Sequence, residues 1–341
     1  MQRRILIPPQ LAGLPPRLPE GEVLDISGHA MGTSWNIKWV QERKFAAEGK
    51  AGRDEVSALA EEALALVIDE MSTWQADSWL SRFNAAPAGS RHALPQHAAR
   101  VLDCALATAA DSKGAFDPTV GPLVNLWGFG PAQARSSPPP TADIAESKVL
   151  CGWWRIALHD GIVEQPGGLY MDFSGIAKGY SVDLIASSLQ NSGIGNFLVE
   201  VGGELYGFGI KPDGQPWWVA LETPVGIDNA VQTIAALHGM AVATSGDYRR
   251  FFDYDGVRYS HTIDPRTGYP VSHAPAGVTV LHASCMRADA YATVLTVVGA
   301  QAGMEYATRC NLAAVFTVLE AGLPVEYHSP ALLAMVEEET A

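Results

Sequence analysis

Residues 244–270 read TSGDYRRFFDYDGVRYSHTIDPRTGYP, an aromatic-rich segment that also contains turn-forming glycines and a proline. Loops on a rigid scaffold commonly carry chemistry, and residues 264–268 have the composition of a tight turn. The stretch predicts either a functional loop that presents His261 to a ligand or a β-hairpin with a structural histidine. Its hydroxyl and titratable side chains stand where the chain must turn: Ser245, Asp247, His261, Asp264 and Thr267.

The rest of the chain predicts more strands than helices, in an order that does not alternate regularly. Apolar and polar residues alternate from Trp35 to Trp39, as in a half-buried strand, whereas apolar residues recur at helical spacing from Asp54 to Met71. The order favours an α+β fold with largely antiparallel sheets and packed helices. Further strands are expected near 154–159, 197–201, 217–223, 233–243, 257–263, 277–281 and 313–317, and further helices at 96–113, 176–191, 287–299 and 301–309.

We expect one domain, residues 28–335, preceded by an extended Pro-rich segment, residues 1–27. Prolines are frequent in residues 8–21, which favours extended backbone on the surface. The segment 131–143 is interpreted as a linker or surface loop. It is not taken as a domain boundary, because short strands and candidate site residues lie on both sides.

The composition predicts a globular, acidic protein. Hydrophobic residues make up 48%, charged residues 18%, and the formal net charge is −14. An acidic surface argues against nucleic-acid binding, which needs concentrated Lys and Arg. An anionic nucleotide would need local donors or a divalent cation at its phosphates. The four cysteines are scattered without a CxxC pair, so neither a zinc site nor a disulfide framework is expected: Cys104, Cys151, Cys285 and Cys310.

The N-terminal sequence carries no recognisable targeting signal. Arg3 and Arg4 are followed by too few apolar residues before Pro8 and Pro9 for a signal-peptide core, and no lipid-anchor motif or membrane-spanning run is visible. As numbered, the chain is expected in the cytoplasm without a membrane span, although a leader removed before the numbering began would leave no trace.

The first candidate site is MDFSGIAKGY at residues 171–180, where an acidic strand end runs into a small-residue turn and a helix. Gly175 and Gly179 would let the backbone approach a ligand, and free N–H groups at a helix start favour phosphate. Lys178 adds a cation there. The spacing does not match a P-loop, and a plain strand-to-helix connection is the alternative.

The second candidate is RADAYAT at residues 287–293. Asp289 and Thr293 are four residues apart, so on a helix they share one face. A carboxylate and a hydroxyl are hard oxygen ligands, and Mg²⁺ accepts so sparse a set because it keeps waters and binds phosphates. The alternative is an Asp in a first helical turn, stabilised by the helix dipole.

The third candidate comprises GAFDPTVGP at 114–122 and NLWGFG at 125–130, together with Trp74 in MSTWQADS at 71–78. Loops with glycine, proline and aromatic residues suit a planar ring, and Trp74 could stack on one. The loops also suit a plain surface turn, and a tryptophan such as Trp74 is more often a core residue. A Rossmann G-x-G-x-x-G, a G-x-S-x-G elbow and an H-E-x-x-H motif are absent from the sequence.

In combination, these blocks resemble the FAD:protein FMN transferase (ApbE-type flavin transferase) family over roughly residues 28–318. The family order is kept throughout, which makes the match far more specific than any one block. The blocks are HAMGT at 29–33, MSTW to LSRFN at 71–84, GAFDPTVGPLVNLWGFG at 114–130, DFSGIAKGYSVD at 172–183, VEVGGELYGFG at 199–209, AVATSGDY at 241–248, HTIDPRTGYPV at 261–271 and ADAYAT at 288–293.

The resemblance implies a fold related to the T-fold and a Mg²⁺-dependent reaction. In it, the FMN half of FAD passes to a Thr or Ser hydroxyl of an acceptor protein and AMP is released. It implies Mg²⁺ ligands at Asp289, Thr293 and the carbonyls of Gly175 and Ala292. It places FAD contacts at Met31, Trp74, Ala115, Phe116, Asp117, Asp172, Lys178 and Ile263.

The resemblance also places a transfer histidine at His261. An imidazole has a suitable ordinary pKa for taking the acceptor proton, and Asp264 is the candidate orienting carboxylate. Two departures from the family pattern stand out. Trp74 replaces a common tyrosine, and the leader with a lipid-anchoring cysteine that often places members in the periplasm or at the inner membrane is not seen.

Three other functions are left open. Water instead of a hydroxyl acceptor would make the protein an FAD pyrophosphatase that yields FMN and AMP. A non-catalytic FAD carrier or assembly factor would need neither the Asp289/Thr293 pair nor His261. A flavin oxidoreductase is disfavoured because no second-nucleotide motif is visible. The acceptor expected from the family is a redox or electron-transport protein, and neither its identity nor the oligomeric state follows from the sequence.

Overall fold

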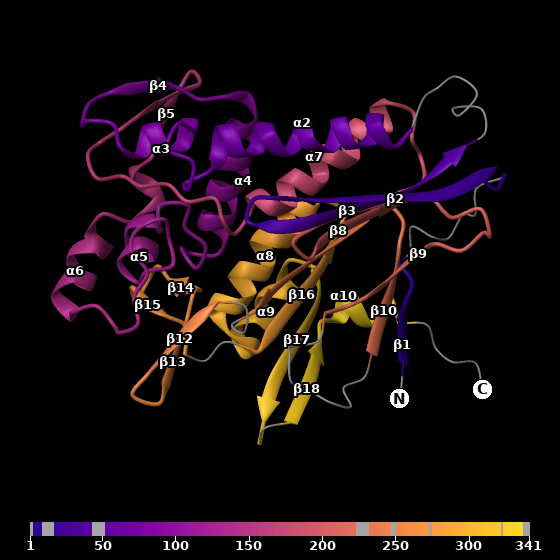
Figure 1. The fold of residues 1–341 in the computed structure, drawn as a ribbon. Coiled ribbons are helices and arrows are strands. Elements are labelled where there is room, and N and C mark those ends of the chain that lie inside the picture. Colours follow the sequence, from indigo (N-terminus) through magenta and orange to yellow (C-terminus); the bar gives the residue numbers. More distant parts are fainter. Residues whose placement is uncertain are drawn as a thin grey trace.

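The computed structural model describes residues 3–8, 17–42, 52–222, 232–246, 250–272, 275–321 and 323–336. At its centre is an eight-stranded sheet in which every neighbouring pair is antiparallel (Figure 1). The predicted α+β class with largely antiparallel sheets is confirmed. The strand order is β18 (Leu323–His328), β17 (Ala313–Glu320), β16 (Gly277–His282), β11 (Met240–Gly246), β8 (Glu204–Phe208), β7 (Phe197–Val201), β3 (Thr33–Glu42) and β2 (Gly21–Ala30).

Helices form a layer along one face of this sheet (Figure 1). The innermost helix is buried nearly all round, because it packs on β11 and β16 on one side and on a neighbouring helix on the other. The five predicted helices are confirmed, with ends shifted by one or two residues. They are α2 (Arg53–Met71), α4 (Gln96–Asp111), α7 (Ala177–Asn191), the innermost helix α8 (Cys285–Val298) and α9 (Ala300–Arg309).

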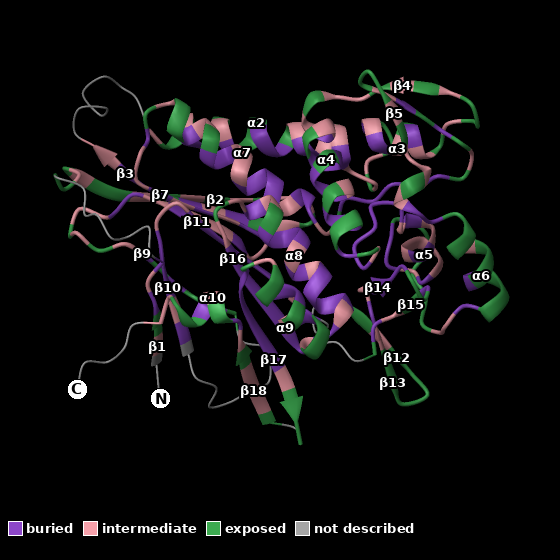
Figure 2. Cartoon of the chain, turned by 180° about the vertical axis from the view of Figure 1, so that it is seen from behind, coloured by how far each residue is buried: buried purple, intermediate pink, exposed green. Residues whose placement is uncertain are grey.

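The opposite face of the sheet is covered by a three-stranded sheet of β1 (Arg3–Leu6), β10 (Gln232–Leu237) and β9 (Trp217–Ala220), together with the short helix α10 (Pro330–Leu333). Side chains along β11 alternate between the two faces. Val242 joins the cluster under the small sheet, whereas Ala243 joins the helix-side core. With both faces covered, β11 is buried along nearly its whole length (Figure 2). The alternation predicted from Trp35 to Trp39 is confirmed on β3, where buried and more exposed residues alternate.

A lobe at one end of the helix layer carries most of the loops (Figure 1). Its small core surrounds Trp127, which is 1% exposed and packs with Leu123 and Ile263. The lobe contains α3 (Trp79–Asn84), β4 (Arg91–Ala93), α5 (Gly121–Leu126), α6 (Thr141–Val149), the 3-10 helix η2 (Trp153–Arg155), β5 (Ala157–His159), β6 (Ile162–Glu164), β12 (Phe251–Tyr254), β13 (Val257–Ser260), β14 (Ile263–Asp264) and β15 (Tyr269–Pro270).

Three predicted strands differ from the structure, each for a local reason. The strand expected at 233–243 is two strands, because Gly239 turns the chain at φ 65° between β10 and β11. The one at 154–159 begins as the 3-10 helix η2, where the Trp153 N–H donates to Asp117. The one at 257–263 is broken at residues 261–262 between β13 and β14.

Strand β1 and the first part of β2 fall within residues 1–27, which we expected to precede the domain as an extended segment. β1 pairs in parallel with β10 and buries Leu6 completely, and β2 starts at Gly21. Among the described residues, every helix is too short or too polar to cross a bilayer.

The start of α8 is fixed by Asp183 of α7. Its carboxylate accepts the Cys285 N–H at 2.8 Å, the Met286 N–H at 3.0 Å and the Ser284 hydroxyl at 2.7 Å. The two N–H groups are backbone donors that a helix start leaves without an intrahelical partner. One half-buried carboxylate therefore joins α7 to α8 and sets where α8 begins.

We expect Asp183→Ala to lower the free energy of unfolding by about 2–3 kcal/mol, because it leaves buried N–H groups without an acceptor. Urea denaturation followed by circular dichroism measures this. Asp103→Ala, at an exposed position on α4, is the matched control and should stay within about 0.5 kcal/mol of the parent. Equal losses in both variants would contradict the capping role.

Candidate active site

The site is built where the first turn of α7 meets α8. The Gly179 N–H donates to Asp289 Oδ2 at 3.0 Å, so a buried carboxylate lies at the positive end of the α7 dipole. A Cβ at Gly179 would lie 2.3 Å from the Cys285 carbonyl oxygen and 2.8 Å from Asp289 Cβ. Only glycine permits this approach between α7 and α8, and the predicted approach of its backbone to a ligand stays a prediction.

Gly175 brings the preceding turn against the same helix. A Cβ there would lie 3.0 Å from Thr293 Oγ1 and 3.4 Å from the Phe116 ring. Asp289 is 3% exposed, and Thr293 is half-buried one turn further along α8. Three of the four predicted metal ligands therefore lie together: Gly175, Asp289 and Thr293.

This set of donors fits Mg²⁺ chemically. One carboxylate, one hydroxyl and a carbonyl are hard oxygens, and Mg²⁺ completes such a sparse set with water and substrate phosphates. Within the described part of the chain, no group of three or more His, Cys, Asp or Glu side chains could hold a metal by itself. The fourth predicted ligand, the carbonyl of Ala292, already accepts the Thr296 hydroxyl at 2.9 Å and is the least supported.

Lys178 does not stand alone at the helix start. Its Nζ lies 2.5 Å from Glu204 Oε1, and Glu204 is only 1% exposed. A Cβ at Gly202, in the β7–β8 turn, would lie 3.4 Å from Lys178 Cδ and 2.9 Å from Thr33 Cγ2. The β7–β8 and β2–β3 turns therefore converge on Lys178, whose charge is held in place by a buried carboxylate.

The loop at 114–122 is braced by Asp117. Its Oδ1 accepts the N–H and hydroxyl of Thr119 at 2.8 and 2.7 Å, and its Oδ2 accepts the Trp153 N–H at 3.2 Å. Burial raises the pKa of Asp117 against these hydrogen bonds. Ala115 and Phe116 are 1% and 5% exposed. Asp117 therefore shapes the loop, and its contact with FAD stays a prediction.

Asp172 joins that loop to the turn before α7. Its N–H donates to the Pro118 carbonyl at 2.8 Å, and its carboxylate accepts the N–H and hydroxyl of Ser174. These bonds form an Asx turn that directs the chain toward Gly175. The two candidate segments, distant in sequence, are thus one structural unit.

Trp74 is 62% exposed, which excludes the alternative of a core tryptophan. The exposed ring face of Trp74 is free of the core, and its stacking on a planar ligand stays a prediction. Met31 lies at the tip of the β2–β3 hairpin with φ 52°, an unusual conformation for a residue other than glycine, and Gly32 follows at φ 73°. Ile263 is buried in the small core beside Trp127.

His261 follows β13 directly. Its N–H donates to the Arg250 carbonyl at 3.0 Å, and its Nδ1 lies 3.1 Å from the same oxygen. The Phe129 ring meets the imidazole edge-on, with centroids 6.4 Å apart. The imidazole is half-buried and directly follows the β12–β13 hairpin, and its presentation to a ligand stays a prediction.

The orienting role predicted for Asp264 needs correction. Its carboxylate is engaged in a fork with Arg266, with Nε–Oδ1 and Nη2–Oδ2 both at 2.9 Å, and it also accepts the Arg266 N–H. The Arg250 carbonyl contacts His261 Nδ1 instead. Because a guanidinium matches both carboxylate oxygens, Asp264 fixes the turn and Arg266 rather than the imidazole.

Local sequence patterns did not predict Glu204, Arg250 and Arg266 as residues of the candidate site. Glu204 stands in the quoted block VEVGGELYGFG, where a buried acid amid apolar residues signals a charge partner. Arg266 lies in the turn 264–268, and a Cβ at Gly114 would lie 4.0 Å from its Cγ. Asp247 lies outside the described residues.

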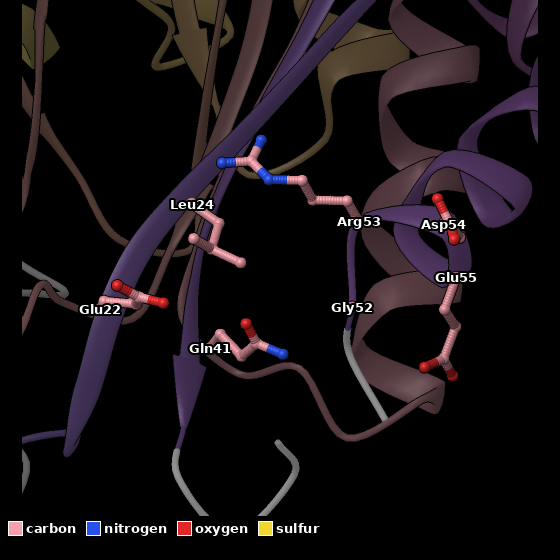
Figure 3. A pocket seen from close by; sticks show the side chains of 7 residues that line it. All are labelled: Glu22, Leu24, Gln41, Gly52, Arg53, Asp54 and Glu55. Atoms are coloured by element: carbon pink, nitrogen blue, oxygen red, sulfur yellow. The ribbon is translucent and has the colours of Figure 1, made fainter. Parts of the chain in front are cut away.

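A separate groove of about 900 Å³ lies between the β2–β3 hairpin and the start of α2 (Figure 3). None of its lining residues is a predicted site residue. They are Glu22, Leu24, Gln41, Gly52, Arg53, Asp54 and Glu55.

Comparison with known proteins gives the family. The ApbE family profile matches residues 31–316. A relative from Vibrio cholerae serotype O1, named FAD:protein FMN transferase, is 42% identical over 287 residues, covering 84% of each chain. A Haemophilus influenzae protein of the same name is 36% identical, covering 86% of each.

A solved structure agrees. The apo Pseudomonas stutzeri flavinyl transferase ApbE superposes with a TM-score of 0.85 at 38% identity, over 92% of this chain and 96% of that one. The fold, with a central sheet and helices packed on one face, is thus that of solved flavin transferases. This chain belongs to the ApbE family.

We expect Lys178→Ala to lower the free energy of unfolding by about 3 kcal/mol, because it removes the cation 2.5 Å from the buried Glu204. Adding Glu204→Gln should recover most of this loss, since a neutral amide costs less to bury. Urea titrations of the single and double variants give the coupling energy. Additive losses would show that the pair is not coupled.

Proposed function

We propose that this chain transfers the FMN moiety of FAD to a Thr or Ser hydroxyl of an acceptor flavoprotein, releasing AMP, with Mg²⁺ at Asp289 and Thr293. The observation that carries the proposal is the packing of the Asp289–Thr293 face of α8 against the start of α7, with Lys178 beside it. A cation site, helix N–H groups and a lysine gathered in one place suit a diphosphate. The names of the relatives add that their diphosphate substrate is FAD.

The reaction forms one phosphorus–oxygen bond and breaks another. The acceptor hydroxyl oxygen bonds to the FMN-side phosphorus of FAD, and the bridging oxygen leaves with AMP. The hydroxyl proton passes to His261, so the products are a phosphodiester-linked FMN, AMP and an imidazolium. Bound Mg²⁺ supplies positive charge at the phosphate oxygens.

The chain's own side chains bind the phosphates, stack on a ring of FAD and accept the proton. Lys178, held by Glu204, offers a cation to the phosphates from the first turn of α7. Trp74 offers an exposed ring face for the isoalloxazine or adenine ring. His261 serves as general base, a role that commonly contributes about 100- to 10,000-fold to rate.

The test incubates the protein with FAD, MgCl₂ and purified Thr-containing domains of candidate redox proteins. Intact mass spectrometry of each domain and an AMP assay are the readouts. We expect a gain of one FMN on an acceptor, lost with EDTA and when the acceptor Thr becomes Ala. AMP with free FMN and no adduct across the panel would favour the pyrophosphatase, and bound FAD without AMP the carrier.

We expect His261→Ala to slow transfer by about 100-fold or more while FAD affinity changes little, because only the proton acceptor is lost. Single-turnover transfer rates and FAD titration separate the two effects. His159→Ala, at an exposed histidine on β5, is the control and should match the parent. Near-full transfer by His261→Ala at saturating FAD would refute the base role.

We expect Thr293→Val to raise the Mg²⁺ concentration for half-maximal transfer by about tenfold, because an oxygen ligand is removed without changing side-chain shape. Asp289→Asn should act more strongly, although its amide oxygen can still accept the Gly179 N–H. Thr308→Val, on α9, removes an exposed hydroxyl that bonds only within its helix and is the matched control. An unchanged Mg²⁺ dependence in both site variants would place the metal elsewhere.

A further inference from the structure

Arg250 connects three segments of the candidate site that are far apart in sequence. It stands directly before β12 and contacts His261 through its backbone and the Trp74 and Phe129 regions through its side chain. Neither the family resemblance nor the proposed chemistry assigns it a role.

The backbone contact determines which imidazole nitrogen can act as a base. A carbonyl oxygen can only accept a hydrogen bond, so the Nδ1 that lies 3.1 Å from the Arg250 oxygen must carry the proton. In the neutral ring the lone pair is then on Nε2. A neutral Nδ1–H tautomer is the form that a proton acceptor working through Nε2 requires.

The position of that carbonyl depends on the hairpin of β12 and β13. In the described part of the chain these strands form a sheet of only two, and such a sheet is marginally stable by itself. Phe252 and Tyr259 on one face stack against Trp127, with centroids 6.4 and 5.6 Å away. These contacts anchor the middle of the hairpin, and its open end is closed by the pairing of Phe251 with Ser260 and by the hydrogen bond from the His261 N–H to the Arg250 carbonyl.

The Arg250 side chain anchors this end of the hairpin to two other segments. Its Nη2 donates to the Phe129 carbonyl at 3.0 Å, and its Cζ lies 5.9 Å from the centroid of the Trp74 ring. A guanidinium over an exposed tryptophan gains cation–π energy and limits the motion of both groups. One side chain thereby links the end of the 125–130 loop, the Trp74 loop and the strand that holds His261.

We propose that Arg250 is a positioning residue for the transfer reaction. Its side chain holds the carbonyl that keeps His261 in the Nδ1–H tautomer, with the lone pair on Nε2, and it keeps the Trp74 ring in place. The catalytic part of this inference rests on the proposed function. The tautomer and the link to Trp74 are properties of the protein alone.

The test compares Arg250→Ala with Arg258→Ala. Arg258 is the matched control, because it lies in the same hairpin and also places its guanidinium over an aromatic ring, that of Phe251 at 3.9 Å. Proteins labelled with ¹⁵N at histidine report the tautomer of His261 by NMR, with the signal assigned by its loss in His261→Gln. Transfer rates and FAD affinity are measured on the same samples.

We expect the parent and Arg258→Ala to show the Nδ1–H tautomer and Arg250→Ala to show a mixture with Nε2–H. Transfer should fall about tenfold or more in Arg250→Ala, and FAD should bind more weakly by a few fold because Trp74 is less fixed. Arg250→Lys can still donate to Phe129 and should recover part of the tautomer preference. It also provides the comparison if the alanine variant folds poorly.

An unchanged His261 tautomer in both Arg250 variants would overturn the proposal, as would equal changes in Arg258→Ala. If no acceptor is modified by the parent protein, the proposed function fails, and the NMR comparison still decides the positioning role by itself. If transfer occurs but is equal in the parent and Arg250→Ala despite a changed tautomer, the catalytic part of the inference is wrong.

Discussion

The close approach of α7 and α8 at Gly179 is the constraint from which the site follows. With no side chain in the way, the α7 backbone donates directly to Asp289, and the preceding turn brings Gly175 against Thr293. Buried side chains cover both faces of the central sheet and hold α8 against it. Asp183 accepts the N–H of Cys285, the first residue of α8. The sheet is therefore a platform, and the proposed metal and diphosphate site lies where α7 and α8 touch.

Charged groups of the candidate site are held by partners before any substrate arrives. Lys178 is paired with Glu204, Arg266 with Asp264, and Arg250 with the Phe129 carbonyl and the Trp74 ring. Such prior fixation lowers the entropy lost when a charged ligand binds. It also shows how a chain with net charge −14 keeps individual cationic side chains in fixed positions.

Local patterns predicted the long helices and most strands, because burial of one helix face imposes a 3.6-residue period wherever it occurs. They also identified Asp289 and Thr293 as one helix face and Trp74 as a candidate stacking residue. The break at Gly239 was missed, since a single glycine within an apolar run looks like strand until its φ is known. Glu204, Arg250 and the fork between Asp264 and Arg266 depend on contacts between distant segments or on side-chain direction, and sequence spacing carries neither.

The central claim is that FAD and a divalent cation bind together at the α7–α8 contact. A crystal grown with FAD and Mn²⁺, measured at a wavelength where manganese scatters anomalously, tests it directly. The account predicts an anomalous peak beside Asp289 and Thr293, with the pyrophosphate near Lys178 and a flavin or adenine ring on Trp74. A peak and flavin density elsewhere, such as in the groove between the β2–β3 hairpin and α2, would contradict it.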